Sequence, residues 1–558
     1  MWIIPAAILL VTAACAIPLG RAMARVMDAP LGRAERWLDT GPQSWKGYCL
    51  SMLGFNGAMF VVGFVVLACQ AALPLNPDGR GTPAATMTFH TTVSFFANNS
   101  QQHYAGEVHL SYLSQLIVIV WNMFMGGGTS LCALTAVIRG LRGDANLGNF
   151  YVDLWRGVGC VFVPLSLVVA VALVACGVPM TLDGAEKVTT LDGAEQTIAR
   201  GPVAALVPIK NLASVGGGFF GTNSAHPFEN PNAFANFVQC VSMLLLPAAC
   251  VVMFGRMLKR PREAAMLGGV MCVLLIAMFA SAMTAEARCN SALAGLPVAS
   301  DGVNFEGKEL RFGPHAGATY AAITTAVSCG SVNCMHDSLH PLTGLVCLSG
   351  MWTGCVFGGV GVGLIHLLLY VVVAVFLGGL MVGRTPEYLG RKLEAREMKL
   401  AMLALLIHPL LILVPSAVFA GTGWARGSAS NPGPHGLTQT VYEFTSAASG
   451  NGSGFEGLRD TCGSAAETPA RYGSHWDIAA GLVILFGRFV PIIATMALAS
   501  SIGQKPATPR TVGTLRTDTL TFGGVLLAVV LMFGAILYLP IAALGPLAEH
   551  FGPNAFAR

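Results

Sequence analysis

Ten long apolar stretches run through this chain, and each is long enough to cross a lipid bilayer as a helix. They lie near residues 2–20, 48–73, 112–138, 155–176, 233–255, 265–286, 343–383, 399–421, 477–500 and 518–545. Only 11% of the residues are charged, whereas a typical soluble domain carries about 25%. Lipid offers no partners to backbone polar groups, which favours helices as spanning segments. The sequence therefore predicts an all-α polytopic membrane protein with ten transmembrane helices.

The stretch at 343–383 is longer than one crossing requires. The sequence FGGVGVG, from Phe357 to Gly363, interrupts it, so it forms either one broken helix or two crossings. Glycine favours irregular backbone, and a half-helix could swing or unwind at this point. We predict a gate here, with close packing of helices through small residues as the alternative. The predicted gate residues are Gly358, Gly359, Gly361 and Gly363.

The loops between the apolar stretches alternate in length and charge. Short loops carry most of the 32 Lys and Arg residues, and the long loops at about 74–111, 177–232, 287–342 and 422–476 carry fewer. Basic loops mark the cytoplasmic side of a membrane protein. The long loops, the N-terminus and the C-terminus are therefore expected outside.

Each long loop ends in a similar polar sequence before the next apolar stretch. The four sequences run from Thr91 to Glu107, from Ile209 to Pro231, from Thr324 to Ser338 and from Thr445 to Gly457. Irregular backbone at membrane depth is tolerated only inside protein or beside a wet cavity. The chain is thus predicted to contain four helix–pore loop–helix repeats with pseudo-fourfold symmetry. The predicted segments are 1–47, the repeats 48–138, 155–255, 265–383 and 399–500, and a C-terminal helix and tail at 518–558.

Four such loops around one axis would present a ring of carbonyls that can replace the hydration shell of a cation. Acidic residues near the loops are scattered, whereas a divalent cation needs converging carboxylates, so K+ or another alkali ion is favoured. The predicted filter comprises Asn98, Ser214, Val215, Gly216, Ser328, Cys329, Gly330, Asn451 and Gly452, with Asn98, Gly216, Gly330 and Gly452 as the axial positions. Ser94 and Ser449, like Ser214 and Ser328, either orient the loops, add hydroxyl oxygens or cap helices.

Three pairs of motifs carry a resemblance to a known family. They are GGGFF with NSAHPFENP (Gly216 to Phe220, Asn223 to Pro231), SCG with MHDS (Ser328 to Gly330, Met335 to Ser338), and FGGVG with GRTPEYLG (Phe357 to Gly361, Gly383 to Gly390). On these motifs the chain resembles, over nearly its whole length, the A subunit of the Kdp-type potassium-transporting ATPase, in the superfamily of K+ transporters.

The resemblance implies a subunit that binds periplasmic K+ in a filter of backbone carbonyls and passes it to an ATPase. The implied partners are a P-type ATPase B subunit, a C subunit and a small F peptide in the bacterial inner membrane, with no nucleic acid. ATP would be bound and hydrolysed by the B subunit, so this chain is expected to have no catalytic site and no organic cofactor. In keeping with this, the sequence has no P-loop and no DKTG-type phosphorylation motif.

The resemblance also places Gln102 and Arg488 on the ion pathway. Arg488 interrupts an apolar run, where an isolated charge is expensive, so a functional role is expected for it. The alternative is an arginine that is bonded to loop carbonyls within the helix bundle. Lys210 and Glu229 bracket the second loop and are expected to form an ion pair that fixes its ends.

The family's pattern is altered around the filter. Its TNTNWQ-like first loop becomes ANNSQQ (97–102), its GTNGGG becomes ASVGGG (213–218), and its NNNGS becomes SGNGS (449–453). The acidic residue typical before the FGG turn is replaced by Gly354. Because side chains that could hydrogen-bond between loops are lost, we hypothesise weaker K+ selectivity or affinity than is usual for the family.

A second function remains open on the sequence alone. A stand-alone K+ channel or transporter of the Trk/Ktr/HKT kind has the same repeat architecture but no ATPase. An adjacent gene for a P-type ATPase would favour the first function. His103, His226, His336 and His408 show no metal-ligand spacing, so we interpret them as hydrogen-bonded structural histidines.

Overall fold

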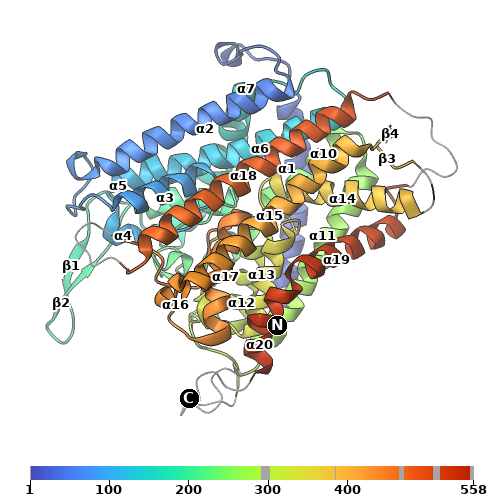
Figure 1. Ribbon diagram of the computed structural model, residues 1–558. Coiled ribbons are helices and arrows are strands. Elements are labelled where there is room, and N and C mark those ends of the chain that lie inside the picture. The colour runs from blue at the N-terminus through green and yellow to red at the C-terminus, as the bar shows by residue number, and fades with distance from the viewer. Residues whose placement is uncertain are drawn as a thin grey trace.

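The computed structural model describes residues 2–290, 302–381, 383, 385–463, 470–506 and 516–552 (Figure 1). Within these residues, ten helices are long and apolar enough to cross a membrane, which confirms the prediction of a ten-helix polytopic protein. They are α1 (Ile3–Met27), α2 (Trp45–Ala68), the span Tyr112–Arg142 that ends in α6 (Trp121–Arg142), the span Phe150–Ala175 that ends in α8 (Val163–Ala175), α10 (Ala233–Met257), α11 (Pro261–Glu286), α14 (Val362–Met381), α15 (Ala395–Thr422), α18 (Gly473–Gly503) and α19 (Leu520–Leu544).

Four shorter helices each precede one of the predicted loops. They are α3 (Ala85–Phe96), α9 (Val203–Leu212), α12 (Gly313–Ala326) and α17 (Gly433–Ser449). At 10 to 17 residues they are too short to span a bilayer. Each stands between two spans, so each repeat consists of a span, a short pore helix, a loop and a second span. These pore helices contain no long apolar run, so hydropathy alone places them inside the long loops.

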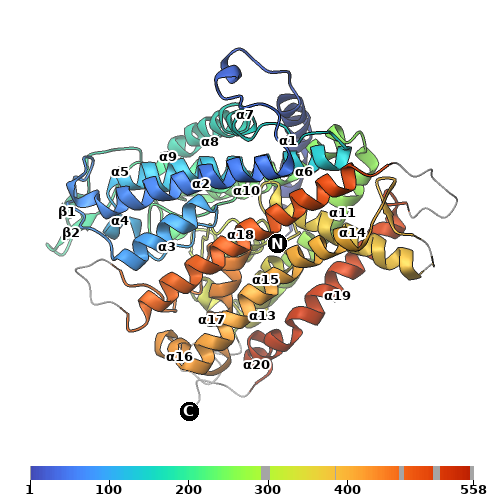
Figure 2. The ribbon, with the colours of Figure 1, turned by 45° about the horizontal axis from the view of Figure 1, so that its top comes forward.

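The second span of each repeat lies closer to the centre of the molecule than the first. In the second spans, between 56% and 72% of the most apolar 18-residue stretch is buried inside the protein, compared with 22% to 50% in the first spans. The first spans therefore offer more apolar surface to lipid, and the second spans surround the loops. Figures 1 and 2 show α2, α18 and α15 side by side with roughly aligned axes.

The stretch at 343–383 is broken into two unequal parts. The 13-residue helix α13 (Pro341–Thr353) ends at Gly354, whose φ of 57° is left-handed, and the 20-residue helix α14 follows at Val362. A left-handed residue is a common way to end a helix, and glycine adopts it without a Cβ penalty. Only α14 is long enough to span, which settles the choice that the sequence left open.

Short helices and two small hairpins lie in the connections between the long helices. The hairpin β1 (Glu186–Thr189) and β2 (Glu195–Ile198) pairs antiparallel with Glu186 opposite Ile198, and β3 (Glu387–Tyr388) pairs with β4 (Arg391–Lys392). Short helices are α4 (Gly106–His109), α5 (Tyr112–Ser114), α7 (Phe150–Trp155), α16 (Trp424–Ser428) and α20 (Pro546–Phe551), and the π-helical turns are Gln115–Val120 and Arg156–Phe162. The predicted segment boundaries stay predictions, and parts of the predicted segments, at 1, 291–301, 382, 464–469 and 553–558, lie outside the described residues.

Candidate cation-binding site

The four loops share one backbone conformation. In each loop, two residues separated by one position have left-handed φ values, which only glycine adopts freely. The pairs are Asn98 and Ser100, Ser214 and Gly216, Ser328 and Gly330, and Gly450 and Gly452. The four non-glycine members carry backbone strain of the kind that concentrates at functional sites.

A matching hydrogen bond anchors each loop to its own pore helix. The amide between the two left-handed residues donates to the carbonyl five positions earlier, at 2.8 to 3.0 Å. These bonds run from Asn99 to Ser94, from Val215 to Lys210, from Cys329 to Thr324 and from Asn451 to Ser446. The same bond in all four loops fixes the equivalence of their residues. Ser100 is therefore the counterpart of the axial glycines, and Asn98, predicted for that role, lies two residues earlier.

The loops meet one another in a closed ring. A Cβ atom on Gly216 would lie 2.2 Å from the carbonyl oxygen of Cys329, and one on Gly330 would lie 2.2 Å from that of Asn451. A Cβ atom on Gly452 would lie 2.5 Å from the carbonyl oxygen of Asn99, so the fourth loop returns to the first. A Cβ atom on Gly217 would lie 3.3 Å from the Cβ of Ser100, which joins the first loop to the second. Four loops that contact each other in chain order and close on themselves surround a common axis.

The residue between the two left-handed positions braces three of the four boundaries between repeats through its side chain. Asn99 Nδ2 donates to the Ala447 carbonyl at 2.8 Å, and Asn451 Nδ2 donates to the Thr324 carbonyl at 2.9 Å. Cys329 Sγ donates a weaker bond to the Lys210 carbonyl at 3.5 Å. The equivalent residue of the second loop is Val215, which has no donor. The donor at this position is thus missing only at the boundary between repeats one and two, where Asn98 Nδ2 donates to the Ala213 carbonyl at 3.4 Å instead. The hypothesis of weak selectivity stays a prediction.

Gln102 and the Lys210–Glu229 pair support the second loop from outside the ring. Gln102 Oε1 accepts hydrogen bonds from the Gly218 amide at 2.7 Å and from Asn223 Nδ2 at 2.9 Å. Lys210 Nζ forms an ion pair with Glu229, and both side chains are fully buried, which confirms the predicted pair. The geometry makes Gln102 a bridge between the first and second loops.

Arg488, on α18, lies beside the first loop and the helix break. Its Nη2 donates to Ser130 Oγ at 2.5 Å and to the Gly126 carbonyl at 3.4 Å, both on α6. A Cβ atom on Gly126 would lie 2.9 Å from Asn98 Oδ1, and one on Gly361 would lie 2.9 Å from the Ser130 carbonyl. The first loop, α6 and the helix break meet at this point. Among the described residues Arg488 forms no ion pair with a carboxylate, so no negative charge offsets its positive charge there.

The predicted gate residues lie in the break between α13 and α14. Gly358, Gly359 and Gly361 have φ values of 27°, 81° and 81°, and the Gly358 amide donates to the carbonyl of Ala326, the last residue of α12, at 3.1 Å. Gly363, in the first turn of α14, would place a Cβ atom 2.4 Å from the Cα of Gly358. The structure therefore brings the break against the inner end of the third pore helix; gating itself stays a prediction.

His226, His336 and His408 each hydrogen-bond one neighbouring group, whereas His435 and His103 lie in ion-pair networks. His435 lies between Asp337 and Glu549, and His103 lies at the outer end of the first loop. His103 Nδ1 lies 2.7 Å from Asp477 Oδ1. Its Nε2 lies 3.1 Å from Glu443 Oε1 and 3.8 Å from Asp460 Oδ2. The ligand atoms of His103, Glu443 and Asp460 lie within 4.8 Å of one another, a spacing a metal ion could use, but both nitrogens already face carboxylates. An ion-pair network is therefore the simpler account.

This network predicts a pH-dependent contribution to stability. Burial disfavours the imidazolium, but the surrounding carboxylates raise the pKa of His103 well above its ordinary value. A raised histidine pKa stabilises the fold fully below the unfolded pKa of about 6.5, and this stabilisation is lost as pH rises through the folded pKa. We expect His103→Gln to lower the thermal unfolding midpoint most at pH 6, with the difference from wild type shrinking towards pH 9. A difference that grows with pH would contradict this assignment.

Two residues of the site, Ser100 and Ser130, are not predicted from the sequence. The asparagine pattern of the first loop favours Asn98 as the counterpart of the glycines, whereas a count from the end of each pore helix identifies Ser100. Ser130 gave no signal, because an isolated serine in an apolar stretch is common and its partner Arg488 lies 358 positions away.

Comparisons with known proteins agree with this architecture. The family described as "Potassium-transporting ATPase A subunit" matches residues 6–551. The "Potassium-transporting ATPase potassium-binding subunit" of Geobacillus kaustophilus (strain HTA426) is 46% identical over 508 residues, covering 91% of this chain and 89% of that protein. The crystal structure of the potassium transporter TrkH from Vibrio parahaemolyticus shares the fold, with a TM-score of 0.53, 14% identity and coverage of 81% of this chain and 84% of that one. The match to the family over nearly the entire sequence, together with the four-loop ring, shows that the chain belongs to the family of potassium-transporting ATPase A subunits.

Proposed function

We propose that this chain binds K+ in the ring of four loops and passes it to the ATPase of a bacterial K+ import complex. The observation that carries the proposal is the closed ring, because converging backbone carbonyls can replace the hydration shell of an alkali ion. The potassium-binding relative supports K+ as the ion. The likeness to TrkH concerns the fold alone, so it does not favour a stand-alone transporter.

The partners would be a P-type ATPase B subunit, a C subunit and a small F peptide, and the B subunit would bind and hydrolyse ATP. This chain would then need neither a catalytic site nor an organic cofactor. An ion leaving the ring would pass the junction of Asn98, Ser130 and Arg488 and then the glycine break near Gly361. Arg488 would keep cations from resting there, because its charge lacks a carboxylate partner among the described residues.

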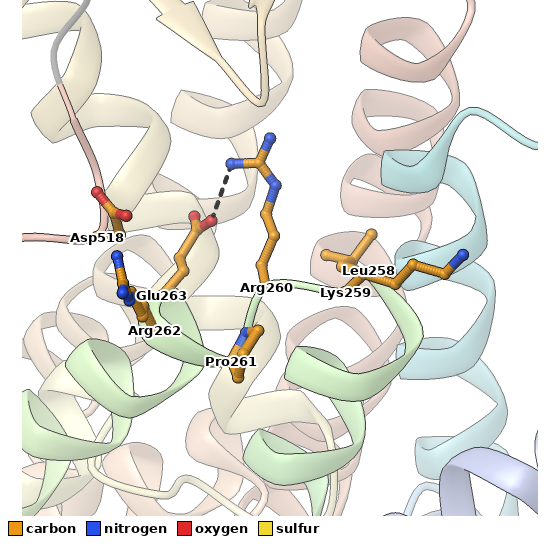
Figure 3. A pocket seen from close by; sticks show the side chains of 7 residues that line it. All are labelled: Leu258, Lys259, Arg260, Pro261, Arg262, Glu263 and Asp518. Atoms are coloured by element: carbon orange, nitrogen blue, oxygen red, sulfur yellow. Dashed lines mark ion pairs between the residues drawn. The ribbon is translucent and has the colours of Figure 1, made fainter.

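The distribution of basic residues supports an orientation in the inner membrane with both chain ends in the periplasm. The opposite side would then be cytoplasmic. A pocket of about 380 Å³ lies there, at the turn between α10 and α11 (Figure 3). Its lining residues are Leu258, Lys259, Arg260, Pro261, Arg262, Glu263 and Asp518. Arg260 Nη1 pairs with Glu263 Oε2 at 3.5 Å, as the dashed line in Figure 3 marks. A surplus of basic side chains at this turn fits the cytoplasmic side.

The proposal is tested with the complex assembled by co-expression of this chain with its ATPase and accessory subunits. We expect ATP hydrolysis to rise saturably with K+ and not with Na+. Gly216→Asp should abolish the rise, because its side chain would enter the space beside the Cys329 carbonyl. K+-independent hydrolysis, or K+ uptake by cells that express this chain without its partners, would favour the stand-alone alternative.

Val215 offers a prediction about selectivity. In the other three loops, the equivalent side chain donates to the pore helix of the preceding repeat. Val215→Asn should supply the missing bond, towards the Ser94 carbonyl, and tighten the ring. We expect a rise of about tenfold in the preference for K+ over Rb+ and NH4+, the worth of roughly one net hydrogen bond. The preference is measured by ion titrations of ATP hydrolysis, and an unchanged preference would show that the missing brace does not limit selectivity.

A further inference from the structure

We propose that the hydroxyl of Ser100 is itself an oxygen ligand of the transported ion, so that the filter combines backbone carbonyls with one side-chain oxygen. This inference rests on the proposed function and adds a specificity-determining residue to the same site. Ser100 holds the position that glycine holds in the other three loops, with a left-handed φ of 75°. The first loop is therefore the one loop of the four that carries a side chain at the axial position.

The side chain reaches across the ring. Ser100 Oγ lies 3.3 Å from the carbonyl oxygen of Asn451 in the fourth loop and 3.5 Å from that of Cys329 in the third. The third loop stands opposite the first in the cyclic order, so an atom close to both carbonyls lies near the axis. A Cβ atom on Gly452 would lie 2.4 Å from Ser100 Oγ, and one on Gly330 would lie 3.0 Å from it. The two glycines thus leave the space that the hydroxyl occupies.

The distances from Ser100 Oγ to the two carbonyl oxygens are better explained by three oxygens that coordinate one cation than by a hydrogen bond between the loops. An O–H···O bond is usually about 2.7–2.8 Å long, and both separations from Ser100 Oγ are longer. One hydroxyl hydrogen cannot serve both carbonyls fully, and Ser100 is only 1% exposed, so bulk water does not complete the bonding. Three partly negative oxygens held together in a buried space are stabilised by a positive ion between them. The strained backbone of Ser100, which glycine would relieve, fits a functional reason for the hydroxyl.

The experiment compares Ser100→Ala and Ser100→Gly with wild type in the co-expressed complex, starting from K+-free buffer. Both variants lose the oxygen, while only the glycine variant also relieves the backbone strain. K+ and Rb+ are titrated separately, with ATP hydrolysis and the ion-dependent shift of the unfolding midpoint as readouts, since at a given concentration an ion that binds more tightly stabilises the fold more. Ser416→Ala is the matched control, because Ser416 is a buried serine of α15 whose hydroxyl, among the described residues, bonds only the Ile412 carbonyl of its own helix.

We expect both Ser100 variants to need about tenfold more K+ for half-saturation, and to lose less affinity for the larger Rb+, because the site becomes wider and has one oxygen fewer. Ser416→Ala should behave as wild type. The inference is overturned if Ser100→Ala titrates as wild type, if both ions weaken equally, or if Ser100→Gly recovers the affinity that Ser100→Ala loses. A wild-type complex without any K+ response would instead overturn the proposed function, on which this inference rests.

Discussion

Gly330→Ala is expected to raise the K+ concentration for half-maximal ATP hydrolysis by about a hundredfold, or to abolish the response. The added Cβ would lie 2.2 Å from the carbonyl oxygen of Asn451, which belongs to the neighbouring loop and cannot rotate aside. The φ of 85° adds strain that any side chain would carry. Because the third loop must shift by a large part of an ångström, the ring loses its geometry, and misplacements of about 1 Å can cost about a hundredfold.

The control for this variant lies at the other end of the same pore helix. Gly313 begins α12 with a similar φ of 76°, but no atom lies within 4 Å of the position of its missing Cβ. Gly313→Ala therefore imposes the same kind of backbone strain without the collision. We expect it to retain the K+ response with a modest loss of thermal stability. If both variants lost the response equally, strain rather than the contact between loops would be responsible.

The spans were predictable from sequence, because a run of about twenty apolar residues can satisfy its backbone in lipid only as a helix. The pore helices were not predictable in this way. Helix α3, for example, has 12 residues that include His90, Thr91 and Thr92, all buried against protein rather than lipid. Tertiary packing supplies the apolar surroundings that its sequence lacks, so hydropathy gives no sign of it.

The register of the first loop shows how a local similarity can mislead. The sequence TTVS at 91–94 resembles TTAVS at 324–328, which suggests that Ser94 corresponds to Ser328. By backbone conformation the counterpart of Ser328 is instead Asn98, because each is the first residue after its pore helix with a left-handed φ. The repeated motif is therefore displaced by one helical turn between two repeats. Hydroxyl and small residues suit every turn of a buried pore helix, so their pattern does not fix the register.

The contacts that close the ring could not have been read from the sequence. The Cβ position of Gly452 meets Asn99, and Asn451 meets Thr324, across separations of more than a hundred residues. The glycines themselves were predicted, since three of the four loops carry one at the axial position. What they face depends on how four similar loops are arranged in space, and repeat symmetry predicts that arrangement only in outline.

Breaking the buried pair of Lys210 and Glu229 is expected to give the largest loss of stability in the second repeat. Both side chains are fully buried, and Glu229 Oε1 also accepts from the Phe220 amide at 3.0 Å. The Lys210 carbonyl meanwhile receives the amides of Val215 and Gly216, so one residue holds both the pair and the filter loop. Removing one partner leaves a buried charge without compensation, which costs about 3–5 kcal/mol.

A double-mutant cycle separates the pair from its surroundings. Glu229→Gln and Lys210→Met should each sharply reduce the yield and unfolding midpoint of the complex, whereas the double variant should cost less than the sum, because neither charge is then left alone. Glu186→Gln is the matched control: Glu186 pairs with Arg200 in the same repeat at 2.5 Å, but its side chain is 54% exposed, and exposed pairs contribute about 0–1 kcal/mol. Two outcomes would show that the pair does not hold the second loop. The effects of the two single variants on the unfolding midpoint could add up in the double variant, or each single variant could lower the midpoint no more than Glu186→Gln does. Gln102, which bonds both the Gly218 amide and Asn223, would then be the stronger candidate, and Gln102→Ala would become the variant expected to release the loop.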